Sequence, residues 1–360
     1  MTKVLFIALH RPERSPGQRF RFEQYFDYLT ANGFSCELSY LITKEEDKVF
    51  YSQGNYWKKA RLMMKYIKQR KRDAKRAKDF DIIFIFRDAL PTGSIKYEKK
   101  FKASGAKLMY DFDDAIFILD VSAGNKALSF LKKPEKVGDI ISLCDLVIAG
   151  NQYLADYAGK FNQNVTIIPT TIDTEEYQRI DTANSKICIG WSGSVTTIQH
   201  FRFAIPFLIK IQEKYGDQVY FKVIGDGSYQ HAELNIQGIS WTREGEVPEL
   251  SEFDIGIMPL PDDEWANGKC GLKGLQYMAL EIPTLMSPVG VNSDIIQDGE
   301  NGFLADQVDE WVDKISRLIE DKELRLKMGK AARKTVVDEY SILANQDLYL
   351  THFRNVIGRE

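Results

Sequence analysis

Twelve short runs rich in β-branched and aromatic residues recur along this chain, separated by stretches with helical periodicity. This alternation is typical of parallel strands that connecting helices bury on both faces. Because six runs fall in each half, the sequence predicts an α/β fold with two doubly wound domains. The predicted strands are residues 4–9, 34–42, 81–86, 107–112, 145–149, 165–168, 187–191, 220–224, 236–241, 254–258, 283–286 and 302–304.

The composition fits two domains, each with its own hydrophobic core, and excludes several classes of protein. A length of 360 residues with 44% hydrophobic content is enough for two cores, and a net charge of −3 does not favour nucleic acid as a partner. No run of eighteen apolar residues and no signal-peptide pattern occurs, so we expect a cytoplasmic protein. The cysteines lack metal-like spacing and are expected to be buried free thiols: Cys36, Cys144, Cys188 and Cys270.

The domain boundary is predicted near residues 169–186, where polar and turn-forming residues interrupt the apolar pattern. We expect an amino-terminal domain at residues 1–172, a linker at 173–185 and a carboxyl-terminal domain at 186–340. Residues 341–360 are expected to form a helix that crosses back to the amino-terminal domain.

Gly193 and three hydroxyl residues follow the predicted strand 187–191, and ligands of open parallel sheets bind beyond the carboxyl ends of strands. Gly193 lets backbone approach a ligand, and Ser194, Thr196 and Thr197 could cap the helical stretch that comes next. The free N–H groups at such a helix start attract an anion such as phosphate. A capped tight turn without a ligand fits these residues equally well.

Gly225 and Gly227 follow the next predicted strand in the order Ile-Gly-Asp-Gly-Ser. This order looks like the start of a dinucleotide fingerprint, but the position of the third glycine is Gln230. The sequence therefore does not predict a nicotinamide cofactor.

Two lysines and an amide follow the predicted strand 254–258. Lys269, Lys273 and Gln276 are spaced four and three residues apart, which would place them on one face of a helix. Such a face suits a diphosphate and a ribose hydroxyl. A solvated lysine face is the alternative, and the surrounding glycines favour the ligand site.

Several segments, in this order and spacing, resemble the retaining GT-B glycosyltransferases of family 4, the glycosyl transferases group 1. The resemblance is specific across residues 168–340 and looser before them. The segments that carry it are Ser15-Pro-Gly-Gln-Arg-Phe-Arg, Tyr110-Asp-Phe-Asp-Asp, Ile168-Pro-Thr-Thr-Ile-Asp-Thr-Glu-Glu-Tyr, Ile224-Gly-Asp-Gly, Asp254-Ile-Gly-Ile-Met-Pro-Leu, Leu275-Gln-Tyr-Met-Ala, Ser287-Pro-Val-Gly-Val-Asn and Asp298-Gly-Glu-Asn-Gly-Phe-Leu.

This resemblance implies two facing Rossmann-like domains with a cleft between them. It also implies a UDP- or GDP-sugar donor held mainly by the carboxyl-terminal domain, a saccharide acceptor at the other, retention at the anomeric carbon, and no metal. The implied residues for the donor diphosphate and nucleotide are Gly193, Ser194, Gly225, Gly227, Trp241, Lys269, Lys273 and Gln276. Those implied for the donor sugar or the acceptor are Gly17, Arg19, Arg87 and Asn292.

The chain departs from the family pattern at two places. The family's two glutamates, eight positions apart, fall on Gly268 and Gln276, and Ser194 and neutral residues replace its Arg and Lys after the first donor-domain strand. Lys269 and Lys273 then become the expected cations for the diphosphate leaving group. The altered pair keeps a second function class open, a catalytically silent protein that only binds a sugar nucleotide or a partner.

Asp111, Asp113 and Asp114 form an acidic cluster after the predicted strand 107–112. Carboxylates this close could bind Mg²⁺ or Mn²⁺. The resemblance implies instead that Asp113 and Asp114 are catalytic and orient a sugar hydroxyl. A loop cap is the third interpretation, because Asp is common in turns and caps.

The segment that begins at Lys58 and ends at Lys78 contains eleven basic residues and one acidic residue, Asp73. A helix of this kind could lie on anionic lipid, which suits an enzyme that extends lipid-linked saccharides for surface polysaccharide or glycoconjugate synthesis at the inner face of the membrane. A solvated helix face is the alternative. We expect four basic residues on the lipid side, with apolar residues at helical spacing among them: Lys68, Arg70, Lys71 and Arg72, and Trp57, Met63, Met64, Ile67 and Ala74.

Overall fold

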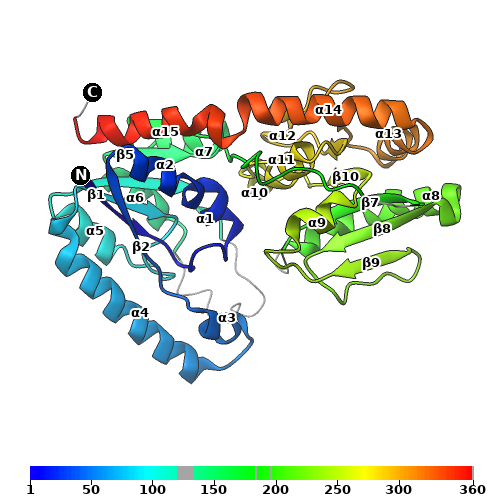
Figure 1. Cartoon of the computed structure of the whole chain (residues 1–360). Helices are drawn as coiled ribbons and strands as arrows, with labels where there is room; N and C mark the ends of the chain where they lie inside the picture. The colour runs from blue at the N-terminus through cyan, green and yellow to red at the C-terminus, as the bar shows by residue number, and fades with distance from the viewer. Residues whose placement is uncertain (120–132, 183–184, 195–196, 359–360) are drawn as a thin grey trace. The chain divides into compact units, whose positions relative to one another are not determined.

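The computed structural model of the chain describes residues 1–119, 133–182, 185–194 and 197–358. The chain divides into two compact units, which we call unit 1 (residues 1–170 and 346–360) and unit 2 (residues 171–345). Each unit contains one six-stranded parallel sheet with helices against it (Figure 1). Helix α15 (Ile342–Val356) begins in unit 2 and ends in unit 1.

The sheet of unit 1 has the strand order β2-β1-β3-β4-β5-β6. Every residue of the central strand β3 is buried, as its uninterrupted sequence Ile-Ile-Phe-Ile-Phe predicts for a strand covered on both faces. The strands are β1 (Thr2–Ile7), β2 (Phe34–Ser39), β3 (Ile82–Phe86), β4 (Lys107–Phe112), β5 (Leu146–Ala149) and β6 (Val165–Ile167).

The sheet of unit 2 has the order β12-β11-β10-β7-β8-β9. All twelve predicted strands are present, although β2 and β9 end two to three residues earlier than predicted, at Ser39 and Ile239. The strands of unit 2 are β7 (Ile187–Ser192), β8 (Val219–Ile224), β9 (Ile236–Ile239), β10 (Ile255–Met258), β11 (Thr284–Met286) and β12 (Phe303–Leu304).

Among the described residues, helices connect most successive strands in both units, β8 and β9 being joined without one, and α13 and α14 follow the last strand. In unit 1 they are α1 (Pro16–Arg21), η1 (Glu23–Tyr25), α2 (Phe26–Ala31), α3 (Lys44–Tyr51), α4 (Tyr56–Arg76), η2 (Ala77–Asp79), α5 (Lys96–Lys102), α6 (Lys136–Leu143) and α7 (Gln152–Gly159). In unit 2 they are η4 (Ile198–Phe203), α8 (Ile205–Tyr215), η5 (Gly216–Gln218), α9 (Glu246–Ser251), α10 (Glu264–Asn267), α11 (Leu272–Ala279), α12 (Asn292–Ile295), α13 (Val308–Glu320) and α14 (Lys322–Glu339).

Aromatic rings form much of the core of unit 1. Phe353 of α15 stacks on Phe84 of β3 with 5.9 Å between ring centroids, and Tyr349 stacks on Tyr25 at 4.3 Å. These rings are buried, and stacked aromatic pairs add to the energy of burial. The end of the chain is therefore part of the core of unit 1.

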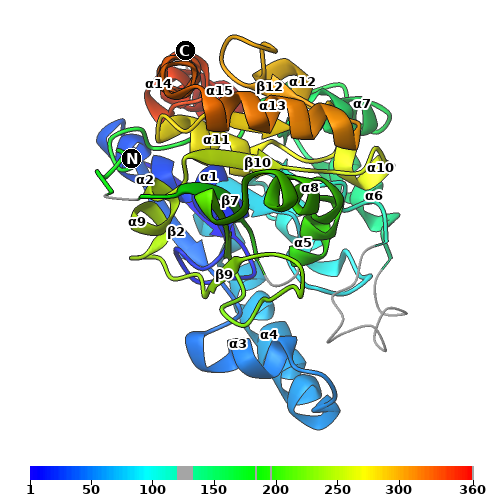
Figure 2. The same cartoon turned by 90° about the vertical axis from the view of Figure 1, so that its right-hand side faces the viewer.

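The core of unit 2 joins α8 and α13 through one aromatic pair. Helices α8 and α13 pack against each other (Figure 2). The rings of Phe207 and Trp311 are parallel within 2°, with centroids 4.5 Å apart, and both side chains are buried. Of the four free cysteines, Cys144, Cys188 and Cys270 are buried and Cys36 is half-buried.

Arg70 of α4 is completely buried, so its predicted place on a lipid-facing side is wrong. Its guanidinium donates to the carbonyl oxygens of Ala8 (2.6 Å), Ser39 (3.1 Å) and Ala89 (2.7 Å), which lie at or just after the ends of three neighbouring strands. It also pairs with Asp73, with 3.0 Å between Nη1 and Oδ2. The buried cation thus links the carboxyl ends of three strands, which residue type alone does not predict.

Replacing Arg70 with Met should lower the free energy of unfolding by about 3 to 5 kcal/mol, because a buried ion pair is broken and three buried carbonyl groups lose a donor. The neighbouring exposed Lys71 provides the control, since Lys71→Met should change stability by no more than about 0.5 kcal/mol. Urea unfolding of the full chain measures both variants. Equal stability of the two would contradict the role assigned to Arg70.

Candidate functional site

In each unit the strand order reverses at one point, and residues after the strands on either side of it are placed to meet a ligand. In unit 1 the point lies between β1 and β3, and in unit 2 between β7 and β10. The predicted site residues follow these strands and their neighbours.

Arg87, Asp113 and Asp114 come together at the carboxyl edge of the unit 1 sheet. Arg87 donates from Nε to Asp113 Oδ1 at 2.7 Å and from Nη2 to Asp114 Oδ2 at 2.5 Å. Burial alone would lower the pKa of Arg87, but the two carboxylates outweigh it and raise that pKa. One guanidinium therefore holds two carboxylates that are 12% and 18% exposed.

Gly17, near the start of α1, packs directly against this cluster. A Cβ at this position would lie 2.7 Å from Asp113 Oδ2 and 3.0 Å from the ring of Phe86. Such distances leave no room for a side chain. The structure therefore brings together four of the residues predicted for unit 1.

Asp111 pairs with a different arginine from the other two aspartates. Both of its carboxylate oxygens accept hydrogen bonds from the buried Arg21, at 3.0 and 2.9 Å. Burial raises the pKa of Asp111 to about 6, although Arg21 acts in the opposite direction. Within the described ranges no group of three or more His, Cys, Asp or Glu residues is arranged to hold a metal ion.

Two further residues complete the description of this edge. Arg19, predicted on the acceptor side, is buried, with its guanidinium 4.2 Å from the ring centroid of Phe20.

His10, which the sequence analysis did not identify, follows β1, and its Nε2 lies 2.6 Å from the Tyr51 hydroxyl. Burial, followed by the charge of Arg14, lowers the pKa of His10 to about 4, and Arg87 acts in the same direction. Its position just after a predicted strand was the one signal available.

In unit 2, Lys269 and Lys273 follow β10, and Lys273 contacts the neighbouring strand β7. The Lys273 ammonium is 5.6 Å from the ring centroid of Trp191 on β7, and the Lys269 ammonium is 5.1 Å from that of Trp265. Both lysines lower the pKa of His200 on η4, so their charges act on the same imidazole. Lys269 precedes α11, which begins at Leu272, so the predicted single helical face of Lys269, Lys273 and Gln276 is wrong.

The predicted glycines bring the ends of β7, β8 and β9 close together. Gly225 has a φ of +133°, and a Cβ there would lie 2.5 Å from the carbonyl oxygen of Gly193. A Cβ at Gly227 would lie 2.5 Å from the Ser240 hydroxyl. Ser194 forms a turn in which its backbone N–H donates to Thr197 Oγ1 at 2.9 Å, while Thr196 lies outside the described residues.

Gln276 and Trp241 belong to a buried hydrogen-bond network that the sequence analysis missed. Gln276 Nε2 donates to the Tyr177 hydroxyl (2.9 Å) and to Glu246 Oε1 (3.2 Å), and Trp241 Nε1 donates to the same Oε1 (3.0 Å). Tyr177 in turn donates to Glu246 Oε2 at 2.6 Å. Gln276 therefore holds a carboxylate supplied by residue 246, thirty positions away.

Asn292 is completely buried at the start of α12. Its Nδ2 donates to the Ser287 carbonyl at 3.0 Å, and its Oδ1 has no hydrogen-bond partner among the described residues. A Cβ added at Gly271, the residue before α11, would lie 3.8 Å from this Oδ1. Asn292 is thus next to the loop that contains Lys269.

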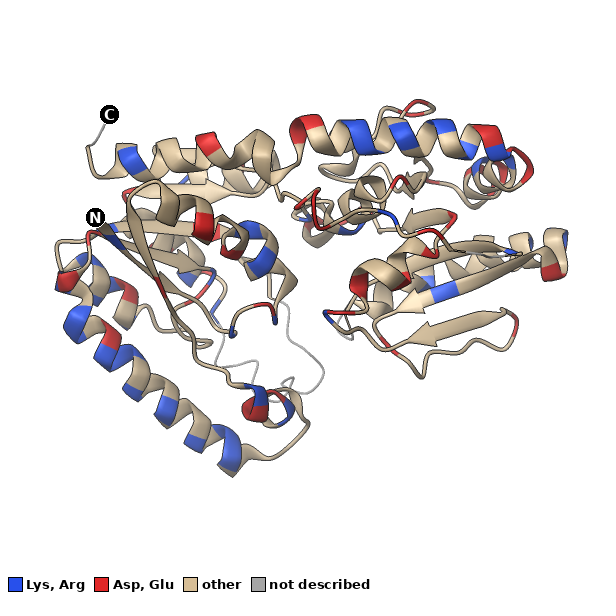
Figure 3. Cartoon of the chain, viewed as in Figure 1, with Lys and Arg blue, Asp and Glu red and all other residues tan. Residues whose placement is uncertain are grey.

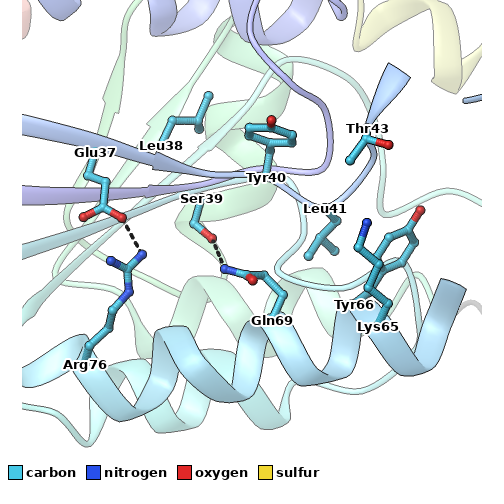
Figure 4. A pocket seen from close by; sticks show the side chains of 10 residues that line it. All are labelled: Glu37, Leu38, Ser39, Tyr40, Leu41, Thr43, Lys65, Tyr66, Gln69 and Arg76. Atoms are coloured by element: carbon cyan, nitrogen blue, oxygen red, sulfur yellow. Dashed lines mark hydrogen bonds and ion pairs between the residues drawn. The ribbon is translucent and has the colours of Figure 1, made fainter. Parts of the chain in front are cut away.

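A separate hollow of about 270 Å³ lies between edge strand β2 and helix α4 (Figure 4). Its cations already have carboxylate partners, since Arg76 pairs with Glu37 at 2.5 Å and Lys65 with Glu46 at 2.5 Å. The hollow is lined by none of the predicted site residues.

Comparisons with known proteins give one matching family model and several structures of similar fold. Residues 186–321 match the family model for Glycosyl transferases group 1. The chain superimposes on a sucrose-phosphate synthase from Thermosynechococcus elongatus (TM-score 0.70, 14% identity, 99% of each chain covered). It also superimposes on a glycosyltransferase from Rickettsia africae (0.69, 15%, 100% of this chain and 99% of that one).

The Anabaena protein HepE, solved in complex with UDP and glucose, is a third structural neighbour (TM-score 0.64, 14% identity, 98% of this chain and 100% of that one). The chain has the α/β fold of these GT-B glycosyltransferases. A search of curated protein sequences finds no match to the chain.

Replacing Gly17 with Ala should destabilise the protein by about 1 to 3 kcal/mol, because the added methyl group overlaps Asp113 and Phe86. Gly159, the last residue of α7, is the matched control: a Cβ there meets nothing within 4 Å, so Gly159→Ala should be neutral or stabilising by up to about 1 kcal/mol. Thermal unfolding distinguishes the two. Equal melting temperatures would show that Gly17 is not a close contact of the cluster.

Proposed function

We propose that this chain is a glycosyltransferase that moves a sugar from a UDP- or GDP-sugar to a saccharide acceptor, with retention at the anomeric carbon. One observation carries the proposal: two lysines follow β10, and one of them contacts Trp191 of β7, inside the region matched by the glycosyl transferase model. The HepE structure, which contains UDP and glucose, supports this class of donor.

The chemistry of the unit 2 site suits a diphosphate leaving group. Breaking the glycosidic bond adds negative charge to the diphosphate, and positive charge placed there in advance lowers the barrier. Lys269 and Lys273 supply two positive charges, and the first turn of α11 adds backbone N–H groups that its own helix does not use.

The carboxylates of unit 1 suit a sugar hydroxyl. Asp113 and Asp114 can accept hydrogen bonds from a hydroxyl and orient it, while Arg87 holds both side chains in place. A metal is not needed to neutralise the diphosphate when two lysines are available, so we include metal independence in the proposal. Turnover that is lost in EDTA and restored by Mn²⁺ would refute that part.

Replacing Lys269 or Lys273 with Ala should lower turnover about 100- to 1000-fold, because each variant removes a charge that the leaving group needs. The assay measures UDP released from UDP-glucose, or GDP from GDP-glucose, with and without saccharide acceptors. Lys322→Ala, an exposed lysine on α14, is the control and should behave as the wild type.

Release of the nucleoside diphosphate also separates the two function classes. An active transferase transfers its sugar slowly to water in the absence of an acceptor, whereas a silent protein binds the nucleotide sugar and returns it intact. Full affinity and turnover in both lysine variants would refute the site assignment.

We further propose that α4 brings unit 1 onto an anionic membrane, where a lipid-linked acceptor is reached. Lysine and arginine positions recur along α4 (Figure 3), and seven of them are exposed: Lys58, Arg61, Lys65, Lys68, Lys71, Arg72 and Lys75. The apolar side chains of Trp57, Met64 and Ile67 are also exposed, by 92%, 65% and 43%. A basic helix with exposed apolar groups suits the surface of anionic lipid. No described helix is long and apolar enough to cross a membrane.

The exposed charges of α4 define the test. Changing Lys68, Lys71, Arg72 and Lys75 to Glu should release the protein from phosphatidylglycerol vesicles, since each basic residue near an anionic surface contributes about 1 kcal/mol. The variant should keep its activity on a soluble acceptor. Lys75 takes the place of Arg70, which is buried.

The matched control makes the same change of charge on another helix, at the exposed Lys322, Lys327, Lys330 and Lys334 of α14. It should leave vesicle binding intact. Equal loss of binding in both variants would show a nonspecific charge effect, and unchanged binding of the α4 variant at low salt would refute the membrane proposal.

A further inference from the structure

His200 lies in the same corner of unit 2 as the two lysines, although no motif marks it. It belongs to the short helix η4, and its backbone N–H donates to the Thr197 carbonyl at 3.0 Å. The next residue, Phe201, is buried against Trp191 with 5.7 Å between ring centroids. The Lys273 ammonium lies 5.6 Å from the ring centroid of the same Trp191, so this indole contacts both the His200 segment and a lysine of the site.

The pKa of the His200 imidazole lies well below its ordinary value. Burial, followed by the positive charges of Lys269 and Lys273, lowers its pKa to about 4. Arg202 acts in the same direction and Asp263 opposes them. The ring is therefore uncharged near neutral pH. Its Nδ1 is buried and has no hydrogen-bond partner among the residues that the structure describes.

A buried ring nitrogen without a partner, next to two ammonium groups, is unfavourable unless another group completes the site. The positive charges of the two lysines disfavour a proton on this ring. The negative charge of a bound diphosphate would favour that proton and so raise the pKa of the ring. A protonated imidazole has two N–H donors, so Nδ1 could then donate to a phosphate oxygen.

We propose that His200 is a third diphosphate-binding residue of unit 2, and that it takes up one proton from solvent when the diphosphate binds. This inference rests on the proposed function, which assigns the diphosphate to Lys269 and Lys273. The site then gains positive charge only when the anion is present. In the empty site a protonated His200 would be repelled by the two lysines.

The sign of the pH dependence follows from linkage. The anion raises the pKa of His200, so binding takes up a proton at any pH between about 4, the value in the free protein, and the higher value in the complex. Affinity for the diphosphate increases as the pH falls through the value in the complex. Below about 4 the gain ends, because the free protein is then protonated as well.

Calorimetry with UDP-glucose, and in parallel GDP-glucose, tests the proposal. Both phosphates of these probes are esterified and release no proton near neutrality, so the dependence of the binding heat on the ionisation heat of the buffer counts protons taken up by the protein. We expect uptake of up to one proton at pH 6.5 for the wild type and none for His200→Asn. The variant should bind about 10- to 100-fold more weakly at pH 6 and approach the wild type as the pH rises.

His231→Asn is the control, because this histidine of unit 2 is not among the charges that act on the site, and it should retain full proton uptake. Ring NMR gives a second measurement, since the chain has 4 histidines and the His200 signal is the one missing from His200→Asn. Its titration midpoint should move above 6.5 when UDP-glucose is added.

The outcomes separate the two proposals. Binding without proton uptake in the wild type, or uptake that persists in His200→Asn, overturns the role of His200 and leaves the lysine site standing. Weaker binding of His200→Asn by the same factor at every pH also overturns it, because a purely structural effect has no pH dependence. If neither probe binds, the donor site and the His200 proposal both fail.

Discussion

All strands of a parallel sheet end at the same edge, and in this chain that constraint selects which residues can take part in chemistry. In unit 1 the chain runs from β1 to β2 on one side of β1 and then to β3 on the other side. In unit 2 it runs from β7 through β8 to β9 on one side of β7 and then to β10 on the other side. The connecting segments diverge at these two points. Arg87 and Asp113, 26 residues apart in the chain, meet at the edge of one sheet, and Lys269 and Lys273 lie beyond the edge of the other.

Arginine side chains donate to backbone carbonyl groups in both units. Arg70 donates to three carbonyls in unit 1, and Arg21 donates to Ile168 at 2.5 Å while pairing with Asp111. In unit 2, Arg333 donates to the carbonyls of Thr174 (3.0 Å) and Tyr177 (2.8 Å). A planar guanidinium can serve several acceptors at once, which a lysine cannot do with the same geometry. Breaking such a buried pair is costly even though forming it contributes little.

The strands could be predicted because their signal is local: a run such as Ile-Ile-Phe-Ile-Phe must be buried wherever it lies. Placing Arg87 beside Asp113, or burying Arg70, depends on contacts between distant residues, and the type of an arginine predicts exposure. The prediction that Lys269 shares a helical face with Lys273 and Gln276 was wrong, because the helix begins only after Gly271, which has a φ of +68°. The acceptor of the Gln276 amide, Glu246, lies thirty residues away, so no spacing rule could find it.

The two candidate sites differ in the sign of their charge, and this difference bears on which substrate each can hold. Arg87, Asp113 and Asp114 carry a net charge of about −1, whereas Lys269 and Lys273 carry about +2 beside a neutral His200. A diphosphate would be repelled by the carboxylates and attracted by the lysines, and a neutral saccharide hydroxyl needs acceptors rather than cations. The proposed placement of the nucleotide sugar in unit 2 and of the saccharide in unit 1 agrees with these charges. The same argument makes a proton on His200 costly before the anion arrives and favourable afterwards.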